Sequence, residues 1–502
     1  MTIQICRIET HAYGGQGIAY VEGKALFLPN AVPGQLVEYR IVKRRKNSLE
    51  GKLLNVLEPS PHETETPPYQ SFGGAPYARV PLETQQQWKR EQIFGLFLSC
   101  AKLHLEQYYK GILSMQNPWE YRNKMEYSFG KSELIVHNLC DNTEENDPIF
   151  DNVENSEAPS CSKPTQKHTK PQKYTTIVDN SFCLGFKKRG RWDIVENLES
   201  PTGLFQNAFE ERLPEIRRFL ESTGLPTFNP VTRQGYFRTL TVRYSFLERQ
   251  YLIELSTTGE HSYDVSLFAN YLQKLFPQQI AGVLHTIKDS EQNIRQTGTS
   301  SLVWGRDSIT EGIAGLTFQV QIQSFAQPNP AMADRLYRLV ADLVQKYDTS
   351  AALIGDYYCG TGTIAQVLAS QLQHRQIFGV ELVPEAVEDA QCNAAINGLH
   401  NVRFHCADVR KFLYHHPEYQ GQVGTVVVDP PRSGMAKKAL LRLLEQGPAC
   451  LVYISCNAAT MARDTATVLE SGFRMREFWL VDQFPHTAHM ECVAVFTREK
   501  EK

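Results

Sequence analysis

The sequence predicts an α/β protein whose C-terminal domain, residues 321–502, is an open, mostly parallel sheet of the doubly wound, Rossmann-like kind. The main observation is that apolar strand-like segments alternate with helical segments from about Ala331 onward. Residues 61–320 hold many strand-like segments without this alternation, which predicts a mixed α/β or β-rich middle domain. Residues 1–60 hold short strand-like segments between Pro-Gly and Asn-Ser turns, which predicts an N-terminal OB-like barrel.

The composition is that of a globular protein with two or three domains: 502 residues, 42% hydrophobic residues and a formal net charge of -3. The N-terminus has no basic segment followed by an apolar core, and no run of about 18 apolar residues occurs, so we expect a cytoplasmic protein with no membrane partner. The 11 cysteines lack the paired spacings of a disulfide framework or a zinc site. The overall charge does not favour a nucleic-acid partner. Binding to nucleic acid would therefore depend on a local basic patch.

The N-terminal strands are expected at residues 24–30, 35–46 and 50–58, within a barrel of five strands. A cluster of basic residues falls in the second of these segments: Arg40, Lys43, Arg44, Arg45 and Lys46. This basic cluster is either a charged edge that resists aggregation or a face that contacts phosphates.

The middle part of the chain opens with a helix expected over residues 82–104. Residues 140–176 are polar and rich in Pro, Ser and Lys, which predicts a flexible insertion. Strands are expected at 236–246 and 250–258.

The C-terminal strands carry acidic residues at their ends. Strands are expected at 351–358, 376–382, 401–408, 424–430 and 450–456, and a final pair at 474–482 and 491–499. Ligands of such sheets bind outside the carboxyl ends of the strands, which here present Asp356, Glu381, Asp408 and Asp429. Each acid alone would more simply be a helix N-cap or a turn residue, but four together predict a ligand site.

The ligand suited to this acidic edge is a nucleoside without phosphates. Gly360 and Gly362 allow the backbone to approach a ligand, but the loop is neither G-x-G-x-x-G nor a Walker A sequence. Glu381 is placed to accept hydrogen bonds from ribose hydroxyls, and Asp408 from an adenine amine. S-adenosylmethionine is such a nucleoside and also carries a cation.

Cys456 ends the fifth strand of this series, and Asn457 after it is placed to cap the next helix. A free cysteine in an apolar segment is more often a small buried hydrophobe than a nucleophile. Its position at the ligand-binding edge of the sheet favours the nucleophile.

Several motifs together resemble the S-adenosylmethionine-dependent RNA uracil-5-methyltransferases of the bacterial 23S rRNA and tRNA type. They are "YRNKMEYSFG" (121–130), "LGFKKRGRWDIV" (184–195), "FAQPN" (325–329), "DYYCGTGT" (356–363), "GVELVPEAVEDAQCNAAINGL" (379–399), "DPPRSG" (429–434), "YISCNAATMARD" (453–464) and "VDQFPHTAHME" (481–491). The N-terminal barrel resembles the RNA-binding TRAM module of this family. The resemblance implies a class I methyltransferase domain at the C-terminus.

The resemblance also implies roles for individual residues. Cys456 would add to carbon 6 of uracil, because carbon 5 is too weak a nucleophile to be methylated directly, and Glu491 would remove the proton from carbon 5. The residues implied for the cofactor site are Gln327, Tyr358, Thr363, Glu381 and Asp408, with Asp429 between cofactor and uracil. His486 and His489 are expected to be structural, and no metal site is expected.

The implied substrate is RNA, bound through the basic cluster and the middle domain, with the target uracil in a loop or flipped out of its stack. The barrel and the large middle domain favour 23S rRNA over the T-loop of tRNA. No obligatory protein partner is evident.

One stretch departs from the family pattern. Many ribosomal members carry an iron-sulfur site with the pattern C-x5-C-G-G-C and a later cysteine. Here Thr66, Phe72 and Ala75 stand at the first three ligand positions, and Ser200 stands at the fourth. Because cluster ligation requires thiolates, we expect no iron-sulfur cluster.

Two alternatives stay open at this point. One is an S-adenosylmethionine-dependent methyltransferase that acts on an amine or exocyclic nitrogen and needs no cysteine. The other is an RNA-binding protein whose catalytic domain has decayed, although every residue that the uracil chemistry needs is present.

Overall fold

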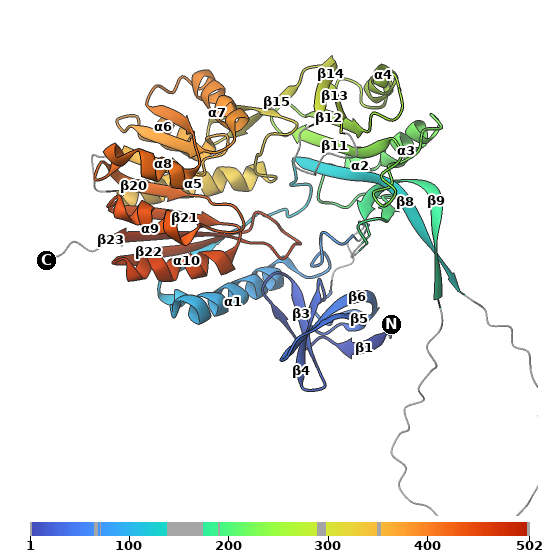
Figure 1. Ribbon diagram of the computed structural model, residues 1–502, viewed down its shortest axis with the longest axis horizontal. Coiled ribbons are helices and arrows are strands. Elements are labelled where there is room, and N and C mark those ends of the chain that lie inside the picture. Colours follow the sequence, from blue (N-terminus) through green and yellow to red (C-terminus); the bar gives the residue numbers. More distant parts are fainter. Residues whose placement is uncertain are drawn as a thin grey trace, which may run out of the picture.

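The computed structural model describes residues 3–64, 69–70, 72–137, 174–188, 191–288, 298–348 and 353–498 (Figure 1). Most of the insertion predicted at 140–176 lies outside these residues, as does Thr66. Within the described part of the chain, no helix is long and apolar enough to cross a membrane.

The N-terminal barrel is built from strands in the order β1-β5-β6-β4-β3-β2. Their bounds are β1 Gln4–Arg7, β2 Thr10–Ala12, β3 Gln16–Val21, β4 Lys24–Pro29, β5 Leu36–Arg44 and β6 Ser48–Glu58. Alternate residues of β4 and β5 are buried, so Leu26, Leu28 and Val37 form the core of the barrel. The prediction of five strands was wrong by one, because the three-residue β2 is too short to show an alternating pattern.

The middle sheet has the strand order β10-β9-β8-β11-β12-β13-β14. Among these described strands β12 and β13 pair in parallel, and the other neighbours pair antiparallel. Its elements are β8 Lys124–His137, β9 Tyr174–Lys187, β10 Val195–Asn197, α2 Asn207–Glu210, α3 Leu213–Glu221, β11 Phe237–Ser245, β12 Gln250–Thr257, α4 Val265–Leu275, β13 Ile280–Ile287 and β14 Thr299–Gly305. The strands predicted at 236–246 and 250–258 are confirmed. A hairpin of β15 (Ser308–Ile313) and β16 (Leu316–Gln321) follows.

The C-terminal sheet has the strand order β19-β18-β17-β20-β21-β23-β22-β7, with the first five strands parallel. Its strands are β17 Leu353–Tyr357, β18 Ile377–Glu381, β19 Val402–Cys406, β20 Val423–Val428, β21 Cys450–Ser455, β22 Phe473–Val481 and β23 Glu491–Arg498. The helices and short 3-10 turns are α5 Pro330–Tyr347, α6 Thr363–Gln371, α7 Pro384–Ile396, α8 Val409–His415, η2 Pro417–Tyr419, α9 Lys437–Glu445 and α10 Ala458–Glu470. Apolar cores lie on both faces of the sheet, as the doubly wound prediction requires.

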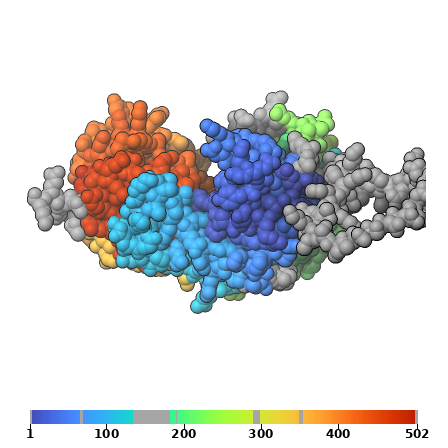
Figure 2. Space-filling view, turned by 90° about the horizontal axis from the view of Figure 1, so that it is seen from below, coloured from blue at the N-terminus to red at the C-terminus, as the bar shows by residue number. Residues whose placement is uncertain are grey.

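A segment from early in the chain completes this sheet. Helix α1 (Leu82–Ala101) packs on α10, and after η1 (Leu105–Gln107) the strand β7 (Tyr109–Leu113) pairs in parallel with β22. Both lie within the range 61–320 that the sequence assigns to the middle domain. Figure 2 shows the light-blue segment that includes α1 between the dark-blue barrel and the red C-terminal domain.

Helix α1 also holds the loop between β22 and β23, which we call the 482–490 segment. Lys89 Nζ lies 2.8 Å from Asp482 Oδ1, and both side chains are almost fully buried. Gln85 Oε1 accepts a hydrogen bond from the backbone N–H of His486 at 2.8 Å. The ion pair therefore fixes the chain that leads directly to Glu491.

We predict that Lys89→Met destabilises the protein by about 3–5 kcal/mol, because Asp482 would be left as a buried charge without its cation. The measurement is the urea midpoint of unfolding. Lys102→Met, which changes an exposed lysine just after α1, should leave the midpoint unchanged. The double variant Lys89→Met/Asp482→Asn should recover part of the loss, and no recovery would contradict the ion-pair argument.

Candidate active site

Cys456 and Glu491 stand at facing ends of two antiparallel strands. Residues Ile454 and Ser455 of β21 pair with Val493 and Cys492 of β23. The pairing ends at Ser455, and extending its register by one position places Cys456 opposite Glu491. Directly opposite residues point to the same face of a sheet. The structure therefore brings together the two residues for which the sequence implied catalytic roles.

The thiol of Cys456 lies in an acidic, half-buried setting. Burial and the nearby carboxyls of Glu491 and Asp429 raise the pKa of Cys456 to about 11. The guanidinium of Arg432 opposes this effect by charge and by a hydrogen bond to the thiol. In the free protein the thiol is thus largely protonated at neutral pH, and Arg432 is the cation that favours its thiolate.

The carboxyls of this edge also hold their protons more tightly than in water. Burial raises the pKa of Asp429 to about 7. Burial, and next the charge of Asp429, hold the pKa of Glu491 well above its usual range, while Arg432 acts in the opposite direction. Glu491 Oε2 is buried and has no hydrogen-bond partner among the described residues. This oxygen is therefore not occupied by a donor from the part of the chain that the structure describes.

The predicted cap of α10 is confirmed, because Asn457 Oδ1 accepts a hydrogen bond from the backbone N–H of Ala459 at 3.1 Å. Asn457 Nδ2 also donates to the carbonyl of Arg432 at 2.8 Å. Asn457 thus links the turn after Cys456 to the "DPPR" loop after β20.

The predicted cofactor residues line the ends of the next strands. Gly360 and Gly362 have positive φ angles of 53° and 72°, and Tyr358 has a φ of 65° that is uncommon for a residue with a side chain. Glu381 Oε2 accepts from the backbone N–H of Gly360 at 3.0 Å, which ties β18 to this loop. Thr363 is the first residue of α6.

Asp408 and Gln327 have structural roles within the protein that do not by themselves indicate a ligand. Asp408 caps α8 by accepting a hydrogen bond from the backbone N–H of Lys411 at 3.0 Å, which is the simpler role expected of such an acid alone. Gln327 is buried, and its side chain forms a hydrogen bond with Tyr337 of α5.

These residues fit a cationic nucleoside. Asp356 is fully buried at the end of β17, and burial and the charges of Asp429 and Glu381 hold its pKa well above the usual range. Asp356 Oδ1 has no partner among the described residues. After Glu381 the side chain of Leu382 is 61% exposed, which offers an apolar surface to a base. A cation bound at this edge would offset the repulsion among the carboxyls.

Sequence reasoning missed three residues near this site. Burial raises the pKa of Tyr337, and Asp429 and Glu491 lie close enough for their charges to raise it further. Arg432 was quoted only as part of "DPPRSG", and Tyr13 of the barrel forms a hydrogen bond with Asn457 at 3.3 Å. The arginine could have been found from the need for a cation beside a thiolate, whereas neither tyrosine has a sequence signal.

The two histidines of the 482–490 segment differ in their surroundings. His486 is buried, stacks on Trp119 with ring centroids 3.8 Å apart, and has a pKa lowered to about 4 mainly by burial. It is therefore neutral at physiological pH. His489 is exposed. The described residues hold no group of three or more His, Cys, Asp or Glu that could bind a metal, and the absence of an iron-sulfur cluster stays a prediction.

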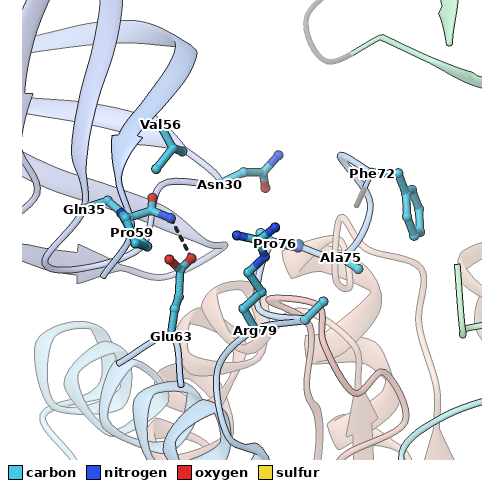
Figure 3. Close-up of a pocket in the computed structure, with 10 residues that line it drawn as sticks. Asn30, Gln35, Val56, Pro59, Glu63, Phe72, Ala75, Pro76 and Arg79 are labelled. Carbon is cyan, nitrogen blue, oxygen red and sulfur yellow. Dashed lines mark hydrogen bonds between the residues drawn. The ribbon is translucent and has the colours of Figure 1, made fainter. Parts of the chain in front are cut away.

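A polar cavity of about 300 Å³ lies at the junction of the barrel and the following linker. Figure 3 shows Asn30 and Gln35 of the barrel on one side of it and Phe72, Ala75 and Arg79 of the linker on the other. None of the residues with predicted catalytic or cofactor roles lines this cavity.

We predict that Arg432→Gln raises the pKa of Cys456 further above about 11, because it removes the cation that favours the thiolate. At pH 9 the rate of Cys456 alkylation by iodoacetamide should then fall roughly threefold to tenfold, since one pKa unit changes the thiolate fraction tenfold. Peptide-resolved mass spectrometry over a pH series measures this rate. Arg410→Gln, an exposed arginine of α8, is the control, and an unchanged profile for Arg432→Gln would refute the assignment.

Comparisons with known proteins identify the family of the chain. Residues 248–499 match the family described as tRNA (uracil-5-)-methyltransferase, and residues 4–54 match the TRAM domain. An uncharacterized RNA methyltransferase of Caldanaerobacter subterraneus is 31% identical over 497 residues, covering 98% of each chain. A relative of the same description from Clostridium tetani is 29% identical over 98% of this chain and 97% of its own.

A solved structure shares the fold of the whole chain. It is the Pyrococcus abyssi tRNA (uracil-54, C5)-methyltransferase in complex with S-adenosyl-L-homocysteine, with a TM-score of 0.68, 20% identity, and coverage of 98% of this chain and 100% of that one. The predicted α/β class, with an N-terminal TRAM barrel and a Rossmann-like C-terminal domain, is confirmed. The chain belongs to the tRNA (uracil-5-)-methyltransferase family of S-adenosylmethionine-dependent RNA methyltransferases.

Proposed function

We propose that the protein methylates carbon 5 of a uridine in RNA, with Cys456 as nucleophile and Glu491 as the base. The observation that supports this most is the facing position of the two residues across β21 and β23, beside Asp429 and Arg432. A cytoplasmic location, where the RNA substrate is found, belongs to the same proposal.

Cys456 would begin the reaction. Its thiolate adds to carbon 6 of uracil, a carbon–sulfur bond forms, and the electron pair of the carbon 5–carbon 6 double bond moves toward carbon 5. Arg432 supports this step because it is the cation that lowers the pKa of the thiol. The strand β21 that ends at Ser455 is fully buried, so the turn that carries the thiol starts from a rigid element.

Glu491 would complete the reaction. Once carbon 5 bears both hydrogen and methyl, a carboxylate oxygen of Glu491 takes the proton, the carbon 5–carbon 6 double bond forms again, and the Cys456 thiolate leaves. Glu491 Oε2, which has no hydrogen-bond partner among the described residues, supports this role. Burial and the charge of Asp429 raise the pKa of this carboxyl, so it must first lose its own proton, and Arg432 favours that loss.

The cofactor would be held by the residues at the ends of β17, β18, β19 and β20. These are Tyr358, Glu381, Asp408 and Asp429, joined by Thr363 at the start of α6 and by Gln327, which precedes α5. When bound, S-adenosylmethionine supplies an electrophilic methyl group. Asp429 influences the charge state of Asp356 on one side and of Glu491 and Cys456 on the other, which supports its proposed place between cofactor and uracil.

The RNA would contact the basic cluster of the barrel. Residues 43–46 are exposed at the junction of β5 and β6. Glu22 and Glu50 lie beside Arg44 and Arg45, so phosphates would have to replace these exposed, weak ion pairs. The target uracil must leave its stack to reach a half-buried thiol.

For the RNA itself, the proposal names 23S rRNA first and the T-loop of tRNA second. Gly73 and Gly74 match the two glycines of the C-x5-C-G-G-C pattern that many ribosomal members carry, which supports the ribosomal type. The three-part architecture does not separate the two, because the P. abyssi tRNA enzyme shares the fold over its whole length.

We predict that Cys456→Ala abolishes methylation, because no other group can activate carbon 5. With 5-fluorouridine RNA and cofactor, the wild type should form a stable covalent complex that denaturing gel electrophoresis detects, and Cys456→Ala should form none. Methylation retained by Cys456→Ala would favour the alternative of an amine or exocyclic-nitrogen methyltransferase.

Glu491→Gln should still form the covalent complex, now with ordinary RNA, and release product at least about 100-fold more slowly, in line with the contribution of a general base. The readouts are the amount of gel-shifted complex and the rate of 5-methyluridine release. Turnover of Glu491→Gln at the wild-type rate would remove Glu491 from the mechanism.

Mapping 5-methyluridine in total RNA from a deletion strain tests the substrate. We expect the loss of a modified uridine in 23S rRNA, restored by the wild type and not by Cys456→Ala. Loss in tRNA alone would replace the first candidate with the second.

A further inference from the structure

A tyrosine of the N-terminal barrel reaches the turn that carries the nucleophile. Tyr13 lies between β2 and β3, and its hydroxyl accepts a hydrogen bond from the backbone N–H of Ala458 at 2.8 Å. The same hydroxyl donates to Asn457 Oδ1 at 3.3 Å. Its ring packs against the apolar core beneath β21. Both contacts join residues more than 440 positions apart in the chain, next to Cys456.

The hydroxyl of Tyr13 satisfies a backbone N–H group at the N-terminus of helix α10. The first backbone N–H groups of a helix have no partner within the helix, and Tyr13 satisfies that of Ala458. Asn457, which receives the hydroxyl proton, is the residue that also bonds Ala459 and the carbonyl of Arg432. One hydroxyl group from the barrel therefore holds the amide that ties the Cys456 turn to the "DPPR" loop.

The turn between β2 and β3, residues 13–15, has little room to move at this contact. A Cβ on Gly15 would lie 2.6 Å from the Cβ of Ala488, so the turn presses directly on the 482–490 segment. On its other side, the backbone N–H of Asn30 donates to the carbonyl of Gly15 at 2.6 Å, and Asn30 lines the cavity of Figure 3. The turn thus lies between the barrel surface and two segments: the turn that carries Cys456 and the 482–490 segment that precedes Glu491.

The hydroxyl stays protonated under all conditions of interest. Burial raises the pKa of Tyr13, and so do the nearby Cys492, Cys456 and Glu491, although the hydrogen bond from Ala458 acts in the opposite direction. Its roles as donor and acceptor are therefore constant with pH.

We propose that Tyr13 is a positioning residue: its two hydrogen bonds let the TRAM barrel fix the turn that presents Cys456 to uracil. The inference rests on the proposed function, in which Cys456 is the nucleophile. It assigns the barrel a part in arranging the active site in addition to any contact with RNA.

The test is Tyr13→Phe, which keeps the ring and removes only the hydroxyl. Tyr20→Phe is the matched control, because Tyr20 belongs to the same barrel and is 60% exposed. We expect the single-turnover rate of methylation to fall about tenfold in Tyr13→Phe, while the Kd for RNA stays within twofold. A weaker Kd with an unchanged rate would make Tyr13 an RNA contact and overturn the proposal.

A second readout uses neither RNA nor cofactor. Freed from Tyr13, the Cys456 turn should expose its half-buried thiol, and alkylation of Cys456 at a fixed pH should become at least about threefold faster. The exposed Cys392 and Cys406 of the same molecule are internal controls and should react at the wild-type rate. Unchanged labelling of Cys456 in Tyr13→Phe overturns the proposal.

A double-variant cycle separates positioning from general loss of stability. Asn457→Ala should also speed Cys456 labelling, and adding Tyr13→Phe should bring little further change, because both act through one amide. If the double variant instead multiplied the increases in labelling rate of the two single variants, the proposal would be overturned. Absence of 5-methyluridine with the wild type would instead refute the proposed function, whereas normal methylation by Tyr13→Phe would refute only this inference.

Discussion

The buried ion pair of Lys89 and Asp482 is the constraint on which the active site depends. It joins α1, which precedes the middle sheet in the chain, to the 482–490 segment at the far end of the sequence. Around it, Gln85 bonds His486, Tyr121 donates to the carbonyl of Pro485, and Trp119 stacks on His486. Glu491 follows this segment directly as the first residue of β23. Contacts from outside the Rossmann-like domain therefore hold the chain that leads to Glu491, while the pairing of β23 with β21 sets its place opposite Cys456.

This anchoring is needed because the site is electrostatically unfavourable by itself. Asp356, Asp429 and Glu491 lie buried near one another, and each has a raised pKa mainly because of burial. Arg432 compensates only in part. Two residues with side chains also adopt positive φ angles: Tyr358 in the loop after β17 and His486 in the 482–490 segment. The backbone strain of such φ angles persists only where surrounding contacts hold the chain, and it clusters at sites that bind ligands.

The local hydrophobic pattern was sufficient to predict most strands of the C-terminal sheet, since each parallel strand is a short apolar segment with a polar end. The strand-end rule then placed Asp429 and Cys456 at one edge, and the family resemblance added Glu491. The pairing of β7 with β22 and the contact of Tyr13 with Asn457 could not be predicted, because each depends on docking of distant segments. The three-residue β2 was missed for a different reason, as it is too short to form a pattern.

The facing position of Cys456 and Glu491 has a consequence for how this sequence can vary. Their separation is set by the spacing of two adjacent strands, about 5 Å, and not by the helix and strand that connect them. Insertions at the far end of α10 would leave nucleophile and base in place. A slip of a single residue in β23 would instead turn Glu491 to the opposite face of the sheet. The chemistry is therefore tolerant of changes in the connecting chain and intolerant of changes in one hydrogen-bond ladder.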